Sequence, residues 1–168
     1  DPPEIFVDAP QDNSFRNSSA FGYQLSEDLL NGIITWKSKK DNVDSSSPHI
    51  VQLEDKELLN GFHKDSILTN YPFLKDSVVY DVSFYGADSA GNLSDTVRIK
   101  DITYDVSKPI ININSPLTND YINDYFISYD ISENISKGEV LWERTGGEDD
   151  PNFIHNQVMN SSELEEKE

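Results

Sequence analysis

The chain has 168 residues, with 31 acidic and 13 basic side chains, and a net charge of −18. Nucleic acids and anionic membranes bind clustered Lys and Arg, so this charge excludes both as partners, and no apolar run is long enough for membrane insertion. The chain has no cysteine, which excludes disulfide bonds, thiol catalysis and cysteine-type zinc sites.

Short apolar runs with a period of two, separated by Asn, Asp, Ser, Gly and Pro, predict an all-β fold. A turn of helix is expected at 56–61, where Gly61 would end it. Seven strands within about 105 residues are typical of one immunoglobulin-like β-sandwich. We expect the strands at 5–7, 21–25, 34–36 and 50–53, within 65–73, at 80–84 and at 97–104.

Three local patterns refine this prediction. The apolar alternation of the last strand changes phase between 99 and 102, which indicates a β-bulge. A turn precedes Tyr80, whose hydroxyl is expected to bond the backbone of that turn, an arrangement called a tyrosine corner. The stretch GADSAGNLSD, 86–95, predicts a hairpin turn whose amides donate to Asp88, since Gly91 and Asn92 tolerate a positive φ.

The chain contains an internal repeat. Residues 1–62 and 107–168 align without a gap at an offset of 142 − 36 = 106, with 14 identities in 62 pairs. The pairs include Trp36 with Trp142 and His49 with His155. We therefore expect one β-sandwich over 1–106 and the first part of a second copy over 107–168, as in a piece of a longer array. A second copy that lacks its last strands would expose a sheet edge or take strands from a partner.

The stretch from 85 to 116, YGADSAGNLSDTVRIKDITYDVSKPIININSP, resembles the junction between tandem bacterial immunoglobulin-like repeats, which are similar to fibronectin type III modules. That family shows D-x-A-G-N-x-S before a final strand and then Y/V-D-x-T-x-P, with Ser107 here in place of the commoner Thr. YQLSEDLLNG, 23–32, and YDISENISKG, 129–138, resemble another stretch of the family. The resemblance implies a stalk, adhesin or matrix protein, secreted or on the cell surface, and some relatives bind calcium at module junctions.

The shared tryptophans and histidines are open to two interpretations. Trp36 and Trp142 could stack on sugars, but their spacing from apolar neighbours favours a place in the core. His49 and His155 could bind a metal, but no second His or Cys is near, which favours a histidine that stabilises its turn by bonding the backbone. No sequence motif of an enzyme is present, and we expect no catalytic activity.

Calcium is the ligand that such an acidic chain suits best, because Ca²⁺ binds six to eight oxygen atoms. Asp105 in the linker is the central candidate, because two modules meet there. Asp12, Asn13 and Asp76 of the first module and Glu133 of the second are expected to face it, whereas Asp88 and Asn92 would lie at the opposite pole with Glu27. The other interpretation is that Asp88 and Asn92 cap their own turn and Asp105 is solvated. The loops 41–47 and 147–152 are secondary candidates.

The sequence thus predicts a structural or adhesive module of a large secreted or cell-surface prokaryotic protein, with neighbouring repeats as its partners and Ca²⁺ stiffening the junctions. One alternative is a module that binds a glycan or protein through loops around 41–48 and 147–154. Phe153 is the one aromatic residue there, and Ser47 replaces it in the first copy. The other alternative is a subunit of a filament or surface layer that a strand from another copy completes.

Overall fold

The computed structural model describes residues 1–41, 43–149, 151 and 154–166. The chain forms two compact units, Asp1–Ser107 (unit one) and Lys108–Glu168 (unit two). Strands build both units, and helical structure in the described ranges is limited to two short 3-10 turns, so the predicted all-β class is confirmed. No helix in the part of the chain that is described is long and apolar enough to cross a membrane.

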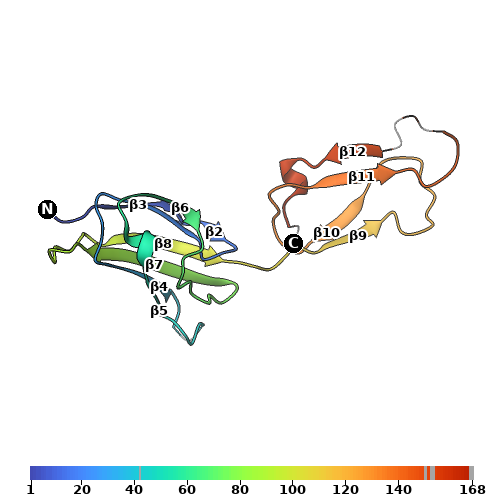
Figure 1. The fold of residues 1–168 in the computed structure, drawn as a ribbon. Helices are drawn as coiled ribbons and strands as arrows, with labels where there is room; N and C mark the ends of the chain where they lie inside the picture. The colour runs from blue at the N-terminus through green and yellow to red at the C-terminus, as the bar shows by residue number, and fades with distance from the viewer. Residues whose placement is uncertain (42, 150, 152–153, 167–168) are drawn as a thin grey trace. The chain divides into compact units, whose positions relative to one another are not determined.

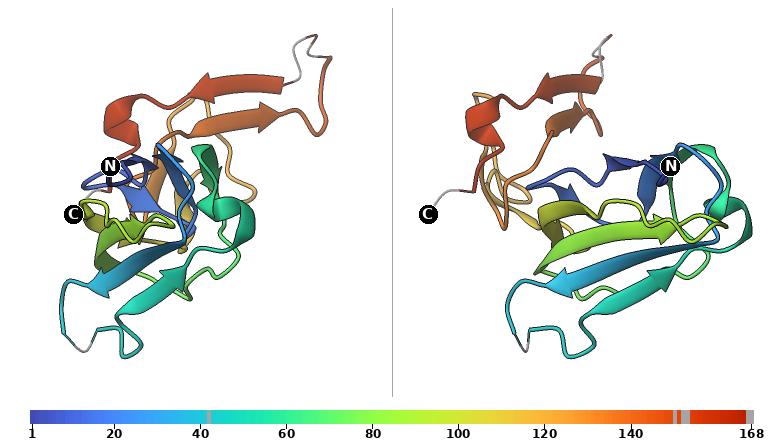
Figure 2. Two further views of the ribbon diagram at one scale, coloured as in Figure 1. Left: turned by 60° about the vertical axis from the view of Figure 1, so that its left-hand side comes forward. Right: turned by 90° about the vertical axis from the view of Figure 1, so that its left-hand side faces the viewer.

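Unit one contains two sheets that lie one above the other (Figures 1 and 2). The only parallel pair of strands in these sheets, as far as the chain is described, joins β2 and β8. The three-stranded sheet has the order β1 (Ile5–Ala9), β3 (Phe21–Leu25) and β6 (Gly61–Ser66). The five-stranded sheet has the order β2 (Phe15–Arg16), β8 (Val97–Tyr104), β7 (Val78–Ala87), β4 (Asn31–Ser38) and β5 (His49–Gln52).

The core of unit one lies between these sheets, because alternate residues of each strand point inward. Phe84 of β7 shows the packing: its ring meets the rings of Phe21 and Tyr23 edge to face, with centroids 5.9 and 5.3 Å apart. Trp36 is 1% exposed and packs against Phe21 and Tyr80. The prediction that Trp36 is a core residue is therefore confirmed.

Two sequence predictions for unit one were wrong in position. The strand expected within 65–73 is β6, which lies at Gly61–Ser66. Most of its side chains are exposed, so its sequence lacks the apolar alternation that marks a strand. The helical turn is the 3-10 turn η1 (Asp55–Leu58), and it ends at Leu59. Gly61, with a φ of +121°, starts β6 and does not end the turn.

The predicted bulge is confirmed. The pairing of β7 with β8 shifts between Tyr80↔Ile102 and Val82↔Ile99. Asp101 lies in the shift and has a φ of 60°, which is uncommon for a residue with a side chain. The shift lets Ile99 and Ile102 both face the core although they are three positions apart.

Unit two consists of two hairpin-like pairs. β9 (Ile111–Ser115) pairs with β10 (Ser128–Ile131), and β11 (Glu139–Glu143) pairs with β12 (Ile154–Val158), both antiparallel. The 3-10 turn η2 (Ser161–Glu163) follows. Ile131, at 6% exposed, is the one buried apolar residue among the described residues of this unit.

Backbone contacts in the two units match at the offset of 106 residues. The Leu53 amide donates to the Gly32 carbonyl at 2.9 Å, and the Met159 amide donates to the Gly138 carbonyl at 3.0 Å. Three further hydrogen bonds of unit one recur in unit two. The bond from Leu29 N to Leu58 O matches that from Ile135 N to Leu164 O, and the bond from Glu4 N to Ser26 Oγ matches that from Ile110 N to Ser132 Oγ. The bond from the Tyr23 hydroxyl to Glu57 O matches that from the Tyr129 hydroxyl to Glu163 O. Asn13 and Asn119 also share a positive φ, 58° and 74°.

Candidate functional site

A buried polar cluster in unit one joins Asp44, His49 and Tyr80. The Tyr80 hydroxyl donates to Asp44 Oδ2 at 2.6 Å, and His49 Nε2 lies 2.6 Å from the same oxygen. The Ser46 amide donates to Asp44 Oδ1 at 3.0 Å. Asp44 is 8% exposed, so this carboxylate is held almost entirely by protein donors.

The chain brings these side chains together from three elements. Asp44 lies in the loop that joins β4 to β5, His49 opens β5 opposite Trp36, and Tyr80 lies on β7. The Lys75 amide donates to the Tyr80 hydroxyl at 2.9 Å, so the predicted bond between Tyr80 and the turn before it is confirmed. His49 was expected to bond the backbone. It contacts the carboxylate of Asp44 instead, and nothing nearby in sequence marks that contact.

The electrostatics of the cluster suit a structural role. Burial alone would raise the pKa of Asp44, but hydrogen bonds from Tyr80, His49 and the Ser46 amide outweigh it and lower the pKa to about 2. Burial and the bond to Asp44 raise the pKa of Tyr80. Asp44 therefore stays ionised and Tyr80 stays protonated at neutral pH, so neither group is poised to exchange a proton there.

In unit two, His155 lies opposite Trp142 in the β11–β12 pair, as His49 lies opposite Trp36. Asp150, the counterpart of Asp44, lies outside the described residues, as do Phe153 and parts of the loops 41–47 and 147–152. Trp142 is partly buried and meets Tyr125 at 6.3 Å between ring centroids. Its Nε1 is buried, and no acceptor for it lies among the described atoms.

Two of the acidic residues named for calcium, Asp76 and Asp105, bond the same short segment of the chain. Asp76 accepts the Val106 amide at 2.8 Å and the Ser107 hydroxyl at 2.9 Å, and these two bonds lower its pKa. Asp105 accepts the Ser107 amide at 3.0 Å, so Asp76 and Asp105 are brought to the same segment.

Asp12 lies elsewhere, because its carboxylate accepts the Lys100 amide at 2.7 Å, five positions before Asp105 on the chain. Asn13 donates its amide to the Lys100 carbonyl at 2.9 Å. Glu133 belongs to unit two, between β10 and β11. In the ranges that are described, no three or more His, Asp or Glu side chains gather as a metal site would require.

Asp88 caps its own turn, as one of the two interpretations predicts. It accepts the Ala90 and Asn92 amides through Oδ1, at 2.9 and 2.8 Å, and the Asn92 side chain through Oδ2 at 2.7 Å. The bond from the Asn92 side chain is the main cause of the lowered pKa of Asp88. Gly91 has a φ of +88°, which the turn requires.

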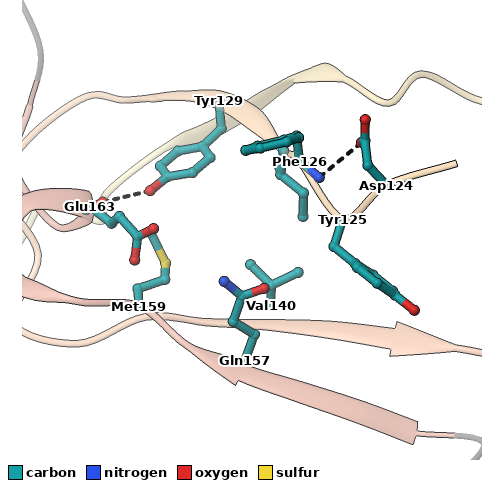
Figure 3. Close-up of a pocket in the computed structure, with 9 residues that line it drawn as sticks. Asp124, Tyr125, Phe126, Tyr129, Val140, Gln157, Met159 and Glu163 are labelled. Carbon is teal, nitrogen blue, oxygen red and sulfur yellow. Dashed lines mark hydrogen bonds between the residues drawn. The ribbon is translucent and has the colours of Figure 1, made fainter. Parts of the chain in front are cut away.

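The other feature of note is a groove in unit two of about 440 Å³ between the β9–β10 and β11–β12 pairs. In Figure 3, Tyr129 and Phe126 lie on one side of it and Val140 and Gln157 on the other. The Tyr129 hydroxyl donates to the Glu163 carbonyl at 2.8 Å and fixes that ring at the wall. We call this feature the open groove; its described lining is Asp124, Tyr125, Phe126, Ile127, Tyr129, Val140, Gln157, Met159 and Glu163.

The open groove corresponds to the filled core of unit one. Tyr129 and Val140 align with Tyr23 and Ile34, which are both fully buried. Phe84 of β7 lies opposite Ile34 in the same sheet, and its ring packs against Tyr23 of the other sheet. On β9, Ile111 is 53% exposed, whereas its counterpart Ile5 is 8% exposed. Six of the nine described lining residues of the groove are aromatic or apolar, so it can hold an apolar ligand better than it can perform acid–base chemistry.

Comparisons of the chain with known family models, with curated proteins and with solved structures find no match.

Proposed function

We propose that the chain is a structural segment of a large secreted or cell-surface prokaryotic protein, in which immunoglobulin-like β-sandwich modules repeat in tandem and act as a stalk. Unit one is one such module, and unit two repeats the part that residues 1–62 form in unit one. The observation that carries the proposal is the set of hydrogen bonds that recur at an offset of 106 residues. These bonds shape the backbone, and none of them prepares a side chain for catalysis.

The architecture of unit one suits a module that bears load. The segment before β3 runs parallel to β8, and three bonds join the two: Asn13 N to Lys100 O, Thr103 N to Ser14 O and Asp105 N to Arg16 O, each 2.9 Å long. A pull on the two ends of the unit loads such bonds together, because parallel neighbours slide along each other instead of peeling apart. The Arg16 guanidinium also bonds Asp65 on the other sheet at 2.8 Å, which ties the sheets together.

Single-molecule stretching of the full chain between two marker proteins tests the proposal. Unit one should open in one step that lengthens the chain by roughly 330–350 Å, from its 107 residues at about 3.5 Å each less the folded span. Asp12→Ala should lower the unfolding force, because Asp12 holds the Lys100 amide of β8. Asp8→Ala, at an exposed position of β1, is the matched control. Extension without a distinct step would refute a role under load.

A second candidate function, a subunit of an extracellular filament or surface layer, is favoured by one observation. Two apolar side chains of β9 in the described part of unit two, Ile111 and Ile113, are 53% and 59% exposed. Light scattering of the full chain tests it, since a self-assembling subunit forms multimers and a stalk segment stays monomeric.

A further inference from the structure

Unit one carries two exposed aromatic rings beside a hollow in its surface. Tyr71 and Phe73 lie in the connection between β6 and β7, are 48% and 82% exposed, and have ring centroids 5.4 Å apart. Both rings line a hollow of about 460 Å³, a volume typical of sites for small ligands. We call it the aromatic hollow. Exposed apolar rings that gather at a hollow are typical of a binding surface.

The backbone is fixed on both sides of these rings. The Thr69 amide, two positions before the first ring, donates to Glu57 Oε1 at 2.7 Å. The Lys75 amide, two positions after the second ring, donates to the Tyr80 hydroxyl at 2.9 Å. Pro72, between the rings, has a fixed φ and also restricts the backbone of the residue before it. Because the segment is already ordered, a ligand that binds there orders little of the chain and loses little affinity to entropy.

The rest of the lining is partly polar and carries no charge. None of the nine lining residues is charged, although 26% of the chain is. Asn17, Ser18, Ser19 and Tyr104 belong to the lining and carry one side-chain amide and three hydroxyls. None of these four side chains hydrogen-bonds another residue in the described ranges. Ser19 is 6% exposed, so its hydroxyl has little access to water and gains from a ligand that bonds it.

The combination of exposed rings and uncharged polar groups matches a neutral sugar. A pyranose ring has a face of C–H groups, which packs on an aromatic ring, and hydroxyls at its edge, which exchange hydrogen bonds with amides and hydroxyls. An apolar protein surface would cover the rings but would leave the four polar side chains without partners, which costs free energy. An acidic ligand would find no Lys or Arg in the lining and would meet a chain with a net charge of −18.

We propose that the aromatic hollow binds a neutral oligosaccharide. Its sugar rings pack on Tyr71 and Phe73, and its hydroxyls bond Asn17, Ser18 and Ser19. Tyr71 also lines a second hollow, of about 410 Å³, so a ligand of more than one sugar unit can extend past this ring. The site is separate from the loops around 41–48 and 147–154, where the sequence suggested glycan binding.

Titration of the full chain with two neutral oligosaccharides, cellotetraose and chitotetraose, followed by NMR, tests the proposal. At least one of them should bind one to one with a millimolar or lower Kd and should shift the ring resonances of Tyr71 and Phe73. Tetragalacturonate, an acidic tetramer of similar size, should bind at least tenfold more weakly than that neutral sugar. No saturable binding of either neutral sugar at tens of millimolar, or equally tight binding of tetragalacturonate, would overturn the proposal.

Two protein variants locate the site. Phe73→Ala removes one of the two rings and should weaken binding about tenfold. Because Phe73 is 82% exposed, this variant should melt within about 2 °C of the wild type. Phe62→Ala removes another exposed ring, on β6 and outside the lining, and should bind within twofold of the wild type.

Equal binding by Phe73→Ala and wild type would overturn the proposal. So would a dimer of the chain that Phe73→Ala abolishes, because the rings would then be a protein interface. The proposal goes beyond the stalk role and does not depend on it. The stretching experiment measures how unit one opens under load, so its result and the result of the sugar titration can fail separately.

Discussion

The stability of unit one should depend on the ionisation of a single buried carboxylate, Asp44. Its pKa falls from an ordinary value of 3.8 to about 2 in the folded state. A carboxylate whose pKa is lower in the folded state stabilises the fold at pH values above its unfolded-state pKa. This stabilisation is lost as the pH falls through the folded-state pKa. The window is therefore pH 4 to 2. A difference of this size corresponds to about 2 kcal/mol of the free energy of unfolding.

The experiment compares wild type with Asp44→Asn by urea unfolding at pH 6 and at pH 2. Trp142→Phe in both proteins leaves Trp36, in the core of unit one, as the only tryptophan reporter. Other acids also titrate in this range, so the informative quantity is the difference between the two proteins. We expect wild type to lose about 2 kcal/mol more than Asp44→Asn between the two pH values.

An exposed carboxylate provides the control. Asp95→Asn, in the connection between β7 and β8, should keep the pH dependence of the wild type within about 0.5 kcal/mol. If Asp44→Asn and wild type lost equal stability between pH 6 and pH 2, the hydrogen bonds from Tyr80, His49 and Ser46 would not be what keeps Asp44 ionised, and the account of the cluster would be wrong.

Three further predictions concern the same fold. Tyr80→Phe removes the hydroxyl between Asp44 and the Lys75 amide and should cost about 2–3 kcal/mol in urea unfolding, whereas a loss below 0.5 kcal/mol would contradict its role. Trp36→Ala should cost about 3–5 kcal/mol and Trp142→Ala less than about 2, because only Trp36 is fully enclosed; equal losses in thermal melts would count against this. If calcium binds as the sequence predicts, calcium at 100 times its Kd should stabilise the fold by about 2.7 kcal/mol, and identical melts with calcium and with chelator would refute that prediction.

Much of the local structure could be predicted because it is written in neighbouring residues. The alternation of Phe21, Tyr23 and Leu25 marks β3 since each of these side chains is buried on the same face. The phase change before Ile102 reveals the bulge for the same reason. β6 was misplaced because an edge strand with exposed side chains carries no such alternation, and β2, with two residues, is too short to show any.

Contacts between distant residues were harder to predict. The bond between Tyr80 and its turn joins residues five positions apart and follows from a local pattern. Asp44 and Tyr80 are 36 positions apart, and only the approach of β7 to the loop after β4 brings them together. The alignment of Asp44 with Asp150 and of His49 with His155 indicated that these residues matter. It could not show that Asp44 and His49 would contact each other.

Identical residues at matched positions have different surroundings in the two units. Trp36 and Trp142 occupy matched positions, and each lies opposite a histidine on the neighbouring strand. Trp36 is also covered by β7, whose Val82 lies opposite it, whereas within the described residues Trp142 has a strand neighbour on one side alone. The local apolar pattern and the pairing with the next strand along the chain determine where a strand forms. The burial of its side chains also depends on the strand at its other edge. The lower burial of Val140 and Trp142, compared with Ile34 and Trp36, therefore follows from what lies beside β11 and not from the local sequence.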